Sequence, residues 1–230
     1  MRDAADCFRK SIEVKERFLA EGGAALVEKA AQMTAQCLRK GGCVYFFGNG
    51  GSAADAQHLA GELVGRFTLE RRALPAVALT TDTSVLTAIA NDYGFDRSFE
   101  RQVEALVRRG DVVVALSTSG NSPNVLRGAA LARKRGARVI ALTGARGGKL
   151  KALAHLCLRA PAEESARIQE CHITIGHALC ALVEDALFGR KNVFGDRRAG
   201  PAGLNAGHAG VARRATRRLP IAKNTRGRQS

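Results

Sequence analysis

The sequence predicts an α/β protein built on a parallel β-sheet that is covered by helices on both faces. Five short apolar runs of strand length alternate with stretches whose apolar residues recur at helical spacing. The predicted strands are residues 43–47, 75–79, 112–116, 138–142 and 155–158. Because strands alternate with helices, we expect right-handed βαβ units, which build parallel sheets.

The first 40 residues are predicted to form two helices ahead of the sheet. The break between them is Glu21-Gly22-Gly23, and Gly41-Gly42 ends the second helix. The apolar residues of the first helix are Phe8, Ile12, Val14 and Phe18, and those of the second are Leu26, Val27, Ala30, Met33 and Leu38.

Two loops rich in glycine and serine follow directly after strands. In residues 48–52 (GNGGS), the glycines permit a sharp turn and Ser52 occupies an N-cap position for a helix to about Val64. In residues 117–123 (STSGNSP), Ser122 is the predicted N-cap and Pro123 the first helical residue. Ligands of parallel sheets bind beyond the carboxyl ends of the strands, where the strand order reverses. We therefore expect both loops to meet at one edge of the sheet.

The remaining elements follow from the same signals. They are a short helix over 84–90, a break at 91–94, a helix carrying Phe99, Val103 and Leu106, a loop at 144–148, and a long apolar helix from Ser165 to about Phe188.

Most of the positive charge lies in the C-terminal segment. The chain has 36 Lys and Arg against 21 Asp and Glu, a net charge of +15. Residues 189–230 contain eleven basic residues and one acidic residue, so they hold +10 and leave +5 for residues 1–188. This segment has few core-forming residues, and we expect a disordered, solvated tail. Its contacts with nucleic acid would be non-specific.

Composition and cysteine spacing indicate an intracellular protein. No apolar run approaches the ~18 residues that span a bilayer, and the N-terminus lacks the apolar core of a signal peptide. Six cysteines occur without a CxxC pair, several of them within apolar runs. They are typical of small buried side chains in a reducing compartment. We therefore expect a cytoplasmic protein with no membrane partner.

Both polar loops are candidate anion sites. A helix N-terminus offers unpaired N–H groups and a partial positive charge, which favour a phosphate or carboxylate. The second loop adds hydroxyl groups that suit a phosphate monoester, namely those of Ser117, Thr118, Ser119 and Ser122. The first loop fits the loose GxGxxG/A pattern, but the acidic residue of dinucleotide sites and the lysine of P-loops are absent. The alternative is that both loops hold ordinary turn and capping residues.

Polar residues on two helices form a second candidate site. His58 and Glu62 are four residues apart and project from one helical face. Their spacing alone leaves open a surface ion pair, a buried satisfied pair, metal ligands or an acid/base pair. In the last helix, Gln169 and His172 share a face, whereas His177 points about 80° away from Gln169. Periodicity therefore selects His172.

Four motifs occur in order along the chain. They are residues 48–52 (GNGGS), 91–95 (NDYGF), 117–122 (STSGNS) and 167–170 (RIQE). Together they resemble the sugar isomerase (SIS) domain family and, within it, the phosphoheptose isomerases, over about residues 5–188. The resemblance implies a flavodoxin-like five-stranded parallel sheet in an SIS domain at 41–188. It also implies that helices 1–40 pack on this domain or its oligomer, and that the protein is a homotetramer with active sites at subunit interfaces.

The resemblance further implies an aldose–ketose isomerase that converts sedoheptulose 7-phosphate into D-glycero-D-manno-heptose 7-phosphate, a precursor of lipopolysaccharide heptose. Carried over by motif, the substrate would be bound by Asn49, Gly50, Gly51, Ser52, Glu62, Asn91, Asp92, Ser117, Thr118, Ser119, Ser122 and Gln169. Glu62 would be the general base and His177 the general acid, so the resemblance favours His177 over His172. One zinc ion per subunit would be held by His58, Glu62, Gln169 and His177.

The expected chemistry agrees with these residue types. Moving a carbonyl between C2 and C1 through an enediol takes a proton from C1 and delivers one to C2. One carboxylate and one imidazole suffice, so no nucleotide or other redox cofactor is needed. Zinc would polarise the carbonyl, and a mixed nitrogen and oxygen ligand set suits an open catalytic site.

A binding protein is the competing interpretation. Residues 88–92 (AIAND) and 165–170 (SARIQE) also resemble the initiator-associating protein, which binds the bacterial replication initiator without catalysis. That group lacks the acid and the histidine that match Glu62 and His177, and this chain has both. Sugar-phosphate-sensing regulators add a helix-turn-helix domain, for which 40 N-terminal residues are too few. The sequence therefore favours the isomerase.

Overall fold

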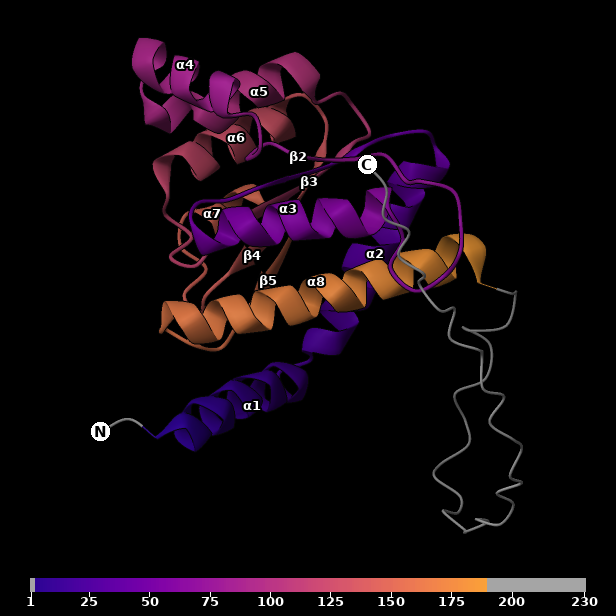
Figure 1. Ribbon diagram of the computed structural model, residues 1–230, viewed down its shortest axis with the longest axis vertical. Helices are drawn as coiled ribbons and strands as arrows, with labels where there is room; N and C mark the ends of the chain where they lie inside the picture. Colours follow the sequence, from indigo (N-terminus) through magenta and orange to yellow (C-terminus); the bar gives the residue numbers. More distant parts are fainter. Residues whose placement is uncertain (1–2, 190–230) are drawn as a thin grey trace, which may run out of the picture. The chain divides into compact units, whose positions relative to one another are not determined.

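Five parallel strands form the sheet of the computed structural model, which describes residues 3–189 (Figure 1). The strands are β1 (Val44–Phe47), β2 (Ala76–Ala78), β3 (Val112–Ser117), β4 (Arg138–Thr143) and β5 (Leu156–Arg159). Their order is β2-β1-β3-β4-β5, and every neighbouring pair is parallel. The order reverses between β1 and β3. The predicted sheet is confirmed, and the predicted tail, apart from Gly189, lies outside the described residues.

Helices cover both faces of this sheet. They are α1 (Ala4–Ala20), α2 (Gly23–Arg39), α3 (Gly51–Val64), α4 (Thr83–Tyr93), the 3₁₀ helix η1 (Phe95–Arg97), α5 (Ser98–Leu106), α6 (Pro123–Lys134), α7 (Leu150–Leu153) and α8 (Ser165–Phe188). The apolar core on one face is made by α1, α2, α3 and α8, and the core on the other by α5, α6 and α7. This is the layered arrangement that alternating strands and helices predict.

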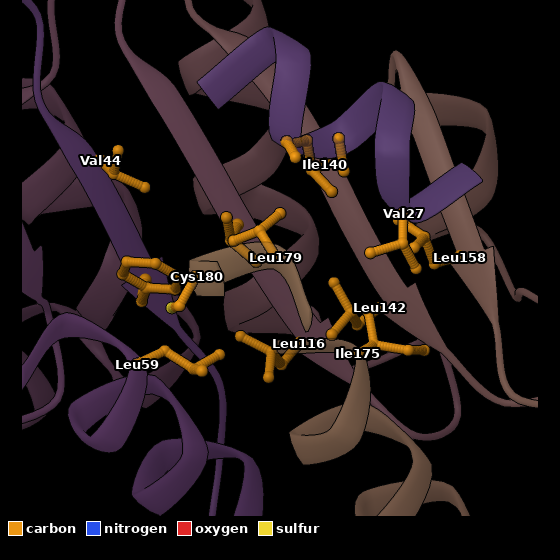
Figure 2. Close-up of a cluster of buried hydrophobic side chains, with 14 of the residues drawn as sticks. Val27, Val44, Leu59, Leu116, Ile140, Leu142, Leu158, Ile175, Leu179 and Cys180 are labelled. Atoms are coloured by element: carbon orange, nitrogen blue, oxygen red, sulfur yellow. The ribbon is translucent and has the colours of Figure 1, made fainter. Parts of the chain in front are cut away.

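The side chains of the central strands alternate between the two cores. Val44, Phe46, Val112, Val114 and Leu116 belong to the first core, and Tyr45, Phe47, Val113 and Ala115 to the second. Buried parallel strands are apolar on both faces, which explains the continuous apolar runs of the sequence. Figure 2 shows part of the first core, where Leu59, Leu116 and Leu179 come from α3, β3 and α8 and gather in one cluster.

Helix α8 fills much of the first core. Its 24 residues are long and apolar enough to cross a membrane by length and composition, a test that core helices also meet. Its buried residues are Ile168, Cys171, His172, Ile175, Gly176, Leu179, Cys180, Val183 and Glu184. Glu164 stands at the N-cap position, one residue before the predicted Ser165. The position of α8 is that of a core helix.

The predicted break between the two N-terminal helices is confirmed. Gly22 has a φ of 81°, and α2 begins at Gly23. A Cβ on Gly23 would lie 2.3 Å from the ring of Phe18, so the two helices meet through glycine. Helix α1 buries Val14 and Phe18, whereas the other two apolar residues predicted for it, Phe8 and Ile12, are 73% and 55% exposed.

Helix α4 is longer than the predicted 84–90. The side chain of Asp82 accepts a hydrogen bond from the backbone N–H of Val85 at 2.9 Å, which starts the helix early. The helix continues through 91–93 and ends at Gly94, whose φ is 91°. Of the predicted break at 91–94, only Gly94 lies outside the helix. Residues 91–93 remain helical, because exposed Asn and Asp are tolerated in the last turn of a helix. Helix α7 was not predicted.

All six cysteines are free thiols. Cys37, Cys171 and Cys180 are buried, and Cys7, Cys43 and Cys157 are half-buried. Burial raises the pKa of Cys37 and Cys171 to about 11, so both remain protonated at neutral pH. The predicted role as small buried side chains is confirmed for three of the six.

Candidate active site

The first polar loop turns sharply at the carboxyl end of β1. Gly50 has a φ of 55° and is the N-cap of α3, whereas Ser52 is buried inside the first turn. The predicted N-cap at Ser52 is therefore wrong, because the left-handed Gly50 lets the helix begin earlier. A Cβ on Gly48 would lie 2.8 Å from the carbonyl oxygen of Leu116, so the loop packs directly on β3. The positive end of the α3 dipole thus lies at the point where the strand order reverses.

The second polar loop gathers hydroxyl groups at the carboxyl end of β3. The Oγ atoms of Ser117 and Ser122 are 3.0 Å apart, and those of Ser117 and Ser119 are 3.5 Å apart. Ser122 is the N-cap of α6 and Pro123 its first residue, as predicted. The Ser122 hydroxyl faces Ser117 rather than capping a helical N–H group. Three hydroxyls and the positive end of α6 therefore converge, which suits a phosphate group.

A pair of asparagines joins the two loops. Asn49 and Asn124 each donate an amide N–H to the other's side-chain oxygen, with both distances 2.8 Å. Asn124 is buried at the start of α6, where its amide also reaches Ser98. The two loops therefore lie side by side at one edge of the sheet, as the sequence predicted.

A third loop, residues 144–148, braces the second loop from behind. The Gly144 N–H donates to the Thr118 carbonyl at 2.9 Å. A Cβ on Gly120 would lie 2.2 Å from the carbonyl oxygen of Gly147, so the loops touch through glycine. A cavity of about 320 Å³ opens here, lined by residues of both loops, among them Thr118 and Ser119.

Helices α3 and α8 run side by side in the same direction (Figure 1). Three contacts define their register: Gly51 with Gln169, Leu59 with Gly176, and the loop residue Phe67 with Glu184. Each contact joins residues 117 or 118 apart in the sequence, as a parallel pair requires. A Cβ on Gly176 would lie 2.5 Å from a methyl group of Leu59, so glycine permits the closest approach.

This packing brings His58 and Glu62 of α3 against His177 of α8. The Nε2 atoms of the two histidines are 2.8 Å apart, and His58 Nε2 lies 3.1 Å from Oε1 of Glu62. The ring of Phe67 lies against that of His177, with centroids 5.5 Å apart. Glu62 and His177 are half-buried and His58 is exposed, so the cluster is open to a ligand.

The His58, Glu62 and His177 cluster has the donor atoms of a metal site. Two imidazole nitrogens 2.8 Å apart form a hydrogen bond when one ring is the N–H donor, and both could instead turn their lone pairs to a shared cation. Two imidazoles and a carboxylate are a ligand set of catalytic zinc sites, which keep a further position open. Burial, reinforced by the Glu62 carboxylate, raises the pKa of Cys180 to about 12, so its thiol is protonated at neutral pH.

Known proteins are similar to this chain in sequence and in fold. Residues 7–144 match the family model of the SIS domain. The chain belongs to the SIS domain family. The family that the sequence motifs predicted is therefore confirmed.

Similar SIS domain proteins are phosphoheptose isomerases. One from Aquifex aeolicus (strain VF5) is 56% identical over 184 residues, covering 80% of this chain and 96% of the relative. One from Rhodospirillum rubrum is 56% identical over 184 residues, covering 80% and 93%. The solved phosphoheptose isomerase from Neisseria gonorrhoeae is 48% identical, with a TM-score of 0.72 over 79% of this chain and 96% of that one. The protein is therefore a sugar-phosphate isomerase, and the predicted enzyme class is confirmed.

Gln169 does not join the His58, Glu62 and His177 cluster within one SIS domain. Its amide lies at the start of α3, where a Cβ on Gly51 would be 2.5 Å from Nε2. Gln169 and His177 are eight residues apart, so their Cα atoms are separated by about 12 Å along α8. The structure therefore brings together three of the four predicted metal ligands.

His172 lies in the core of the SIS domain. It is fully buried, and its Nε2 atom lies 3.1 Å from the carbonyl oxygen of Thr143 at the end of β4. Burial lowers the pKa of His172 to about 4, although the bond to Thr143 opposes the shift. The face that periodicity selected thus packs on the sheet.

Asn91 and Asp92 belong to α4 rather than to the two polar loops or the His58, Glu62 and His177 cluster. They end α4, which packs on α5 and η1 and buries none of its residues. Both side chains are exposed, and the Asn91 amide donates to the Asp92 carboxylate at 2.8 Å. Among residues 3–189, no hydrogen bond or ion pair connects either side chain to the two polar loops.

Sequence reasoning missed Phe67, Asn124 and Glu184. Glu184 gave a signal, since a carboxylate inside an apolar helical stretch must find partners when it is buried. Phe67 and Asn124 gave none, because their roles depend on contacts with segments distant in the sequence.

Proposed function

We propose that this protein interconverts sedoheptulose 7-phosphate and D-glycero-D-manno-heptose 7-phosphate, as a cytoplasmic step toward lipopolysaccharide heptose. The observation that carries the proposal is the Glu62 carboxylate beside two imidazoles on a helix that starts at an anion-binding loop. The relatives named above support the substrate class. A charged sugar phosphate is retained inside cells, which supports the location.

The polar loops and the cluster suit the two ends of an extended substrate. His58 lies seven residues after Gly51, about 10 Å along α3. A seven-carbon sugar phosphate can span a comparable length. Its phosphate would bind the hydroxyls of Ser117, Thr118, Ser119 and Ser122, the sugar would contact Asn49, Gly50, Gly51, Ser52 and Gln169, and its carbonyl end would reach Glu62.

The proposed chemistry is a proton transfer through an enediol. Glu62 removes a proton from C1 while His177 donates one to O2, which gives the enediol. Glu62 then delivers its proton to C2, and His177 takes the proton of the O1 hydroxyl, which leaves an aldehyde at C1. A carboxylate can accept a proton and an imidazole can donate one, which are the roles that general base and acid catalysis require.

His58, Glu62 and His177 would hold one zinc ion per subunit. Bound there, zinc would supply Lewis-acid polarisation of the substrate carbonyl. Gln169, about 12 Å along α8 from His177, would complete the ligand set more readily from a second subunit. Dialysis against a chelator followed by metal analysis and zinc addition tests this site, and unchanged turnover in metal-free protein would contradict it.

We also propose a homotetramer whose active sites are shared between subunits. Phe8, Tyr93 and Phe95 are 73%, 50% and 57% exposed in the single chain, and α4 buries no residue. Exposed apolar groups of this size are typical of interfaces. Asn91 and Asp92 on α4 would then reach the sugar of a neighbouring subunit.

Mixed tetramers test this sharing. Subunits carrying Asp92→Asn and subunits carrying Glu62→Gln are each expected to be nearly inactive. Refolded together, they would form some sites that have both native residues, so activity should return in part. A monomeric mass by light scattering, or mixed tetramers without activity, would contradict shared sites.

The substrate proposal is tested by incubating the protein with sedoheptulose 7-phosphate, with and without zinc, and identifying the product by NMR. An aldoheptose 7-phosphate is expected, and it should disappear with His177→Ala. His155→Asn is a matched control, because it keeps an acceptor for the Val139 N–H that His155 Nδ1 now binds. No product from a folded tetramer would refute the substrate assignment.

A further inference from the structure

A buried ion pair lies next to the candidate active site. Arg71 Nε and Glu184 Oε1 are 2.9 Å apart, and the two side chains are only 1% and 0% exposed. Replacing a buried ion pair by apolar residues is often neutral or stabilising, so stability alone does not explain such a pair. Its contacts show a second role.

The Glu184 carboxylate binds the loop that follows α3. It accepts the backbone N–H groups of Phe67, Thr68 and Leu69 at 2.8–2.9 Å, and the Thr68 hydroxyl at 3.0 Å. Burial raises its pKa, but these N–H bonds outweigh burial and hold the pKa at about 2. Glu184 is therefore ionised at every pH of enzymatic interest.

The Arg71 guanidinium binds the end of α3. It donates to the carbonyl oxygens of Leu63 at 2.8 Å and Gly65 at 3.1 Å. A further N–H bond of 2.9 Å reaches the carbonyl oxygen of Glu62 itself. A cation at a helix C-terminus is favourable, since the last carbonyls lack helical partners. Arg71 thus fixes the backbone that carries the proposed base.

Glu184 belongs to one of the two helices that form the His58, Glu62 and His177 cluster, and Arg71 contacts the other. Glu184 lies two turns after His177 on α8 and fixes the backbone of Phe67, whose ring lies against the His177 ring. Arg71 fixes Glu62 on α3. The ion pair therefore contacts the surroundings of both proposed proton-transfer groups, Glu62 and His177, and helps to fix their positions.

We propose that Arg71 and Glu184 are positioning residues for the isomerisation, which hold Glu62 and His177 in reacting geometry without touching the substrate. The inference rests on the proposed function for the roles of Glu62 and His177. A displacement of about 1 Å in a catalytic group can lower turnover about 100-fold.

The variant Arg71→Lys tests the proposal. It keeps the positive charge beside Glu184, but an ammonium cannot reach the Glu62, Leu63 and Gly65 carbonyls together. We expect kcat to fall about 10- to 100-fold with little change in KM and a retained cooperative unfolding transition. Arg133→Lys is the matched control, because exposed Arg133 also donates to carbonyl oxygens at a helix end, those of Ala152 and Leu153 in α7, and it should match the wild type.

The ring signal of His177 gives a readout that does not depend on turnover. Phe67 shifts this signal by its ring current, and His177→Gln identifies it among the signals of the five histidines. We expect Arg71→Lys, and the isosteric Glu184→Gln if the lysine variant does not fold, to move it. An unmoved signal with near-native kcat would overturn the proposal. A wild type inactive on sedoheptulose 7-phosphate would refute the proposed function alone, and the His177 signal would still decide the positioning role.

Discussion

The two polar sites of the molecule are built in different ways. The loop after β3 takes its hydroxyls from residues 117–122, a single segment between a strand end and a helix start. The His58, Glu62 and His177 cluster joins residues up to 119 positions apart through the packing of α3 on α8. A site made by neighbours in sequence depends on local turns, whereas a site made by two helices depends on every contact that sets their register. The cluster should therefore be the more easily disturbed of the two.

The largest expected effect removes the proposed base and leaves the loop intact. Glu62→Gln should lower kcat about 10²- to 10⁴-fold with KM nearly unchanged, since a neutral amide cannot accept the C1 proton. Steady-state kinetics with sedoheptulose 7-phosphate measure this. Glu70→Gln is the control, because Glu70 is 90% exposed and its carboxylate lies 3.5 Å from Arg66 Nε in the loop that follows α3. A Glu62→Gln enzyme with native turnover would remove the cluster from the chemistry.

Lowering the pH should lower the free energy of unfolding, because His172 on α8 is buried in its neutral form. The folded-state pKa is about 4 and the ordinary value 6.5, so the unfolded chain takes up this proton first as pH falls. Above about pH 6.5, neutral His172 makes its full contribution to the free energy of unfolding. This contribution falls as the pH is lowered from about 6.5 to about 4, by about 3 kcal/mol in all.

Urea unfolding at several pH values measures this loss. His172→Gln, whose amide can still donate to the Thr143 carbonyl, should show a shallower decline of unfolding free energy between pH 6.5 and 4. Parallel curves for the wild type and the variant would show that His172 does not titrate as described.

Gly176→Ala should separate the two sites directly. The added methyl group would press on Leu59, and we expect a loss of about 1–3 kcal/mol in unfolding free energy together with lower kcat. Inhibition by inorganic phosphate, which reports the loop, should remain. Gly61→Ala is the matched control on the partner helix, since its Cβ would meet no atom within 4 Å. If Gly61→Ala lowered stability and kcat as much as Gly176→Ala, the close approach of α3 and α8 at Gly176 would not be what supports the cluster.

The smallest expected effect is in the loop. Ser122→Ala removes one hydroxyl from the proposed phosphate site, and we expect KM to rise about tenfold, or about 1.4 kcal/mol, with kcat nearly unchanged. Ser165→Ala, at the exposed start of α8, should leave both constants unchanged. A fall in kcat without a change in KM would assign Ser122 to the reaction centre instead.

The same contrast explains what the sequence could predict. The strands, the break at Gly22 and the α6 start at Ser122 and Pro123 follow from local signals, and all were predicted. The N-cap of α3 was misplaced by two residues, because the sequence does not reveal that Gly50 adopts a positive φ.

The cluster lay beyond local reasoning for a related reason. Periodicity finds the buried face of one helix but not the helix that packs beside it. It selected His172, which is buried against Thr143. His177 contacts His58 on α3, and the pattern of a single helix gives no information about such a contact with a second helix. The resemblance to a family supplied His177. It also supplied Asn91 and Asp92, which form no hydrogen bond or ion pair with the cluster within residues 3–189.

The glycine contact behind the second loop has a thermodynamic consequence. Gly120 and Gly148 each approach the backbone of the other loop so closely that a Cβ would lie within 2.5 Å of it, and Leu150 N–H donates to the Gly120 carbonyl at 2.9 Å. The loop is therefore already ordered before any ligand arrives. Binding of a phosphate then costs little conformational entropy. Little of the binding free energy is therefore spent on ordering the loop, and most of it contributes to the affinity for the substrate.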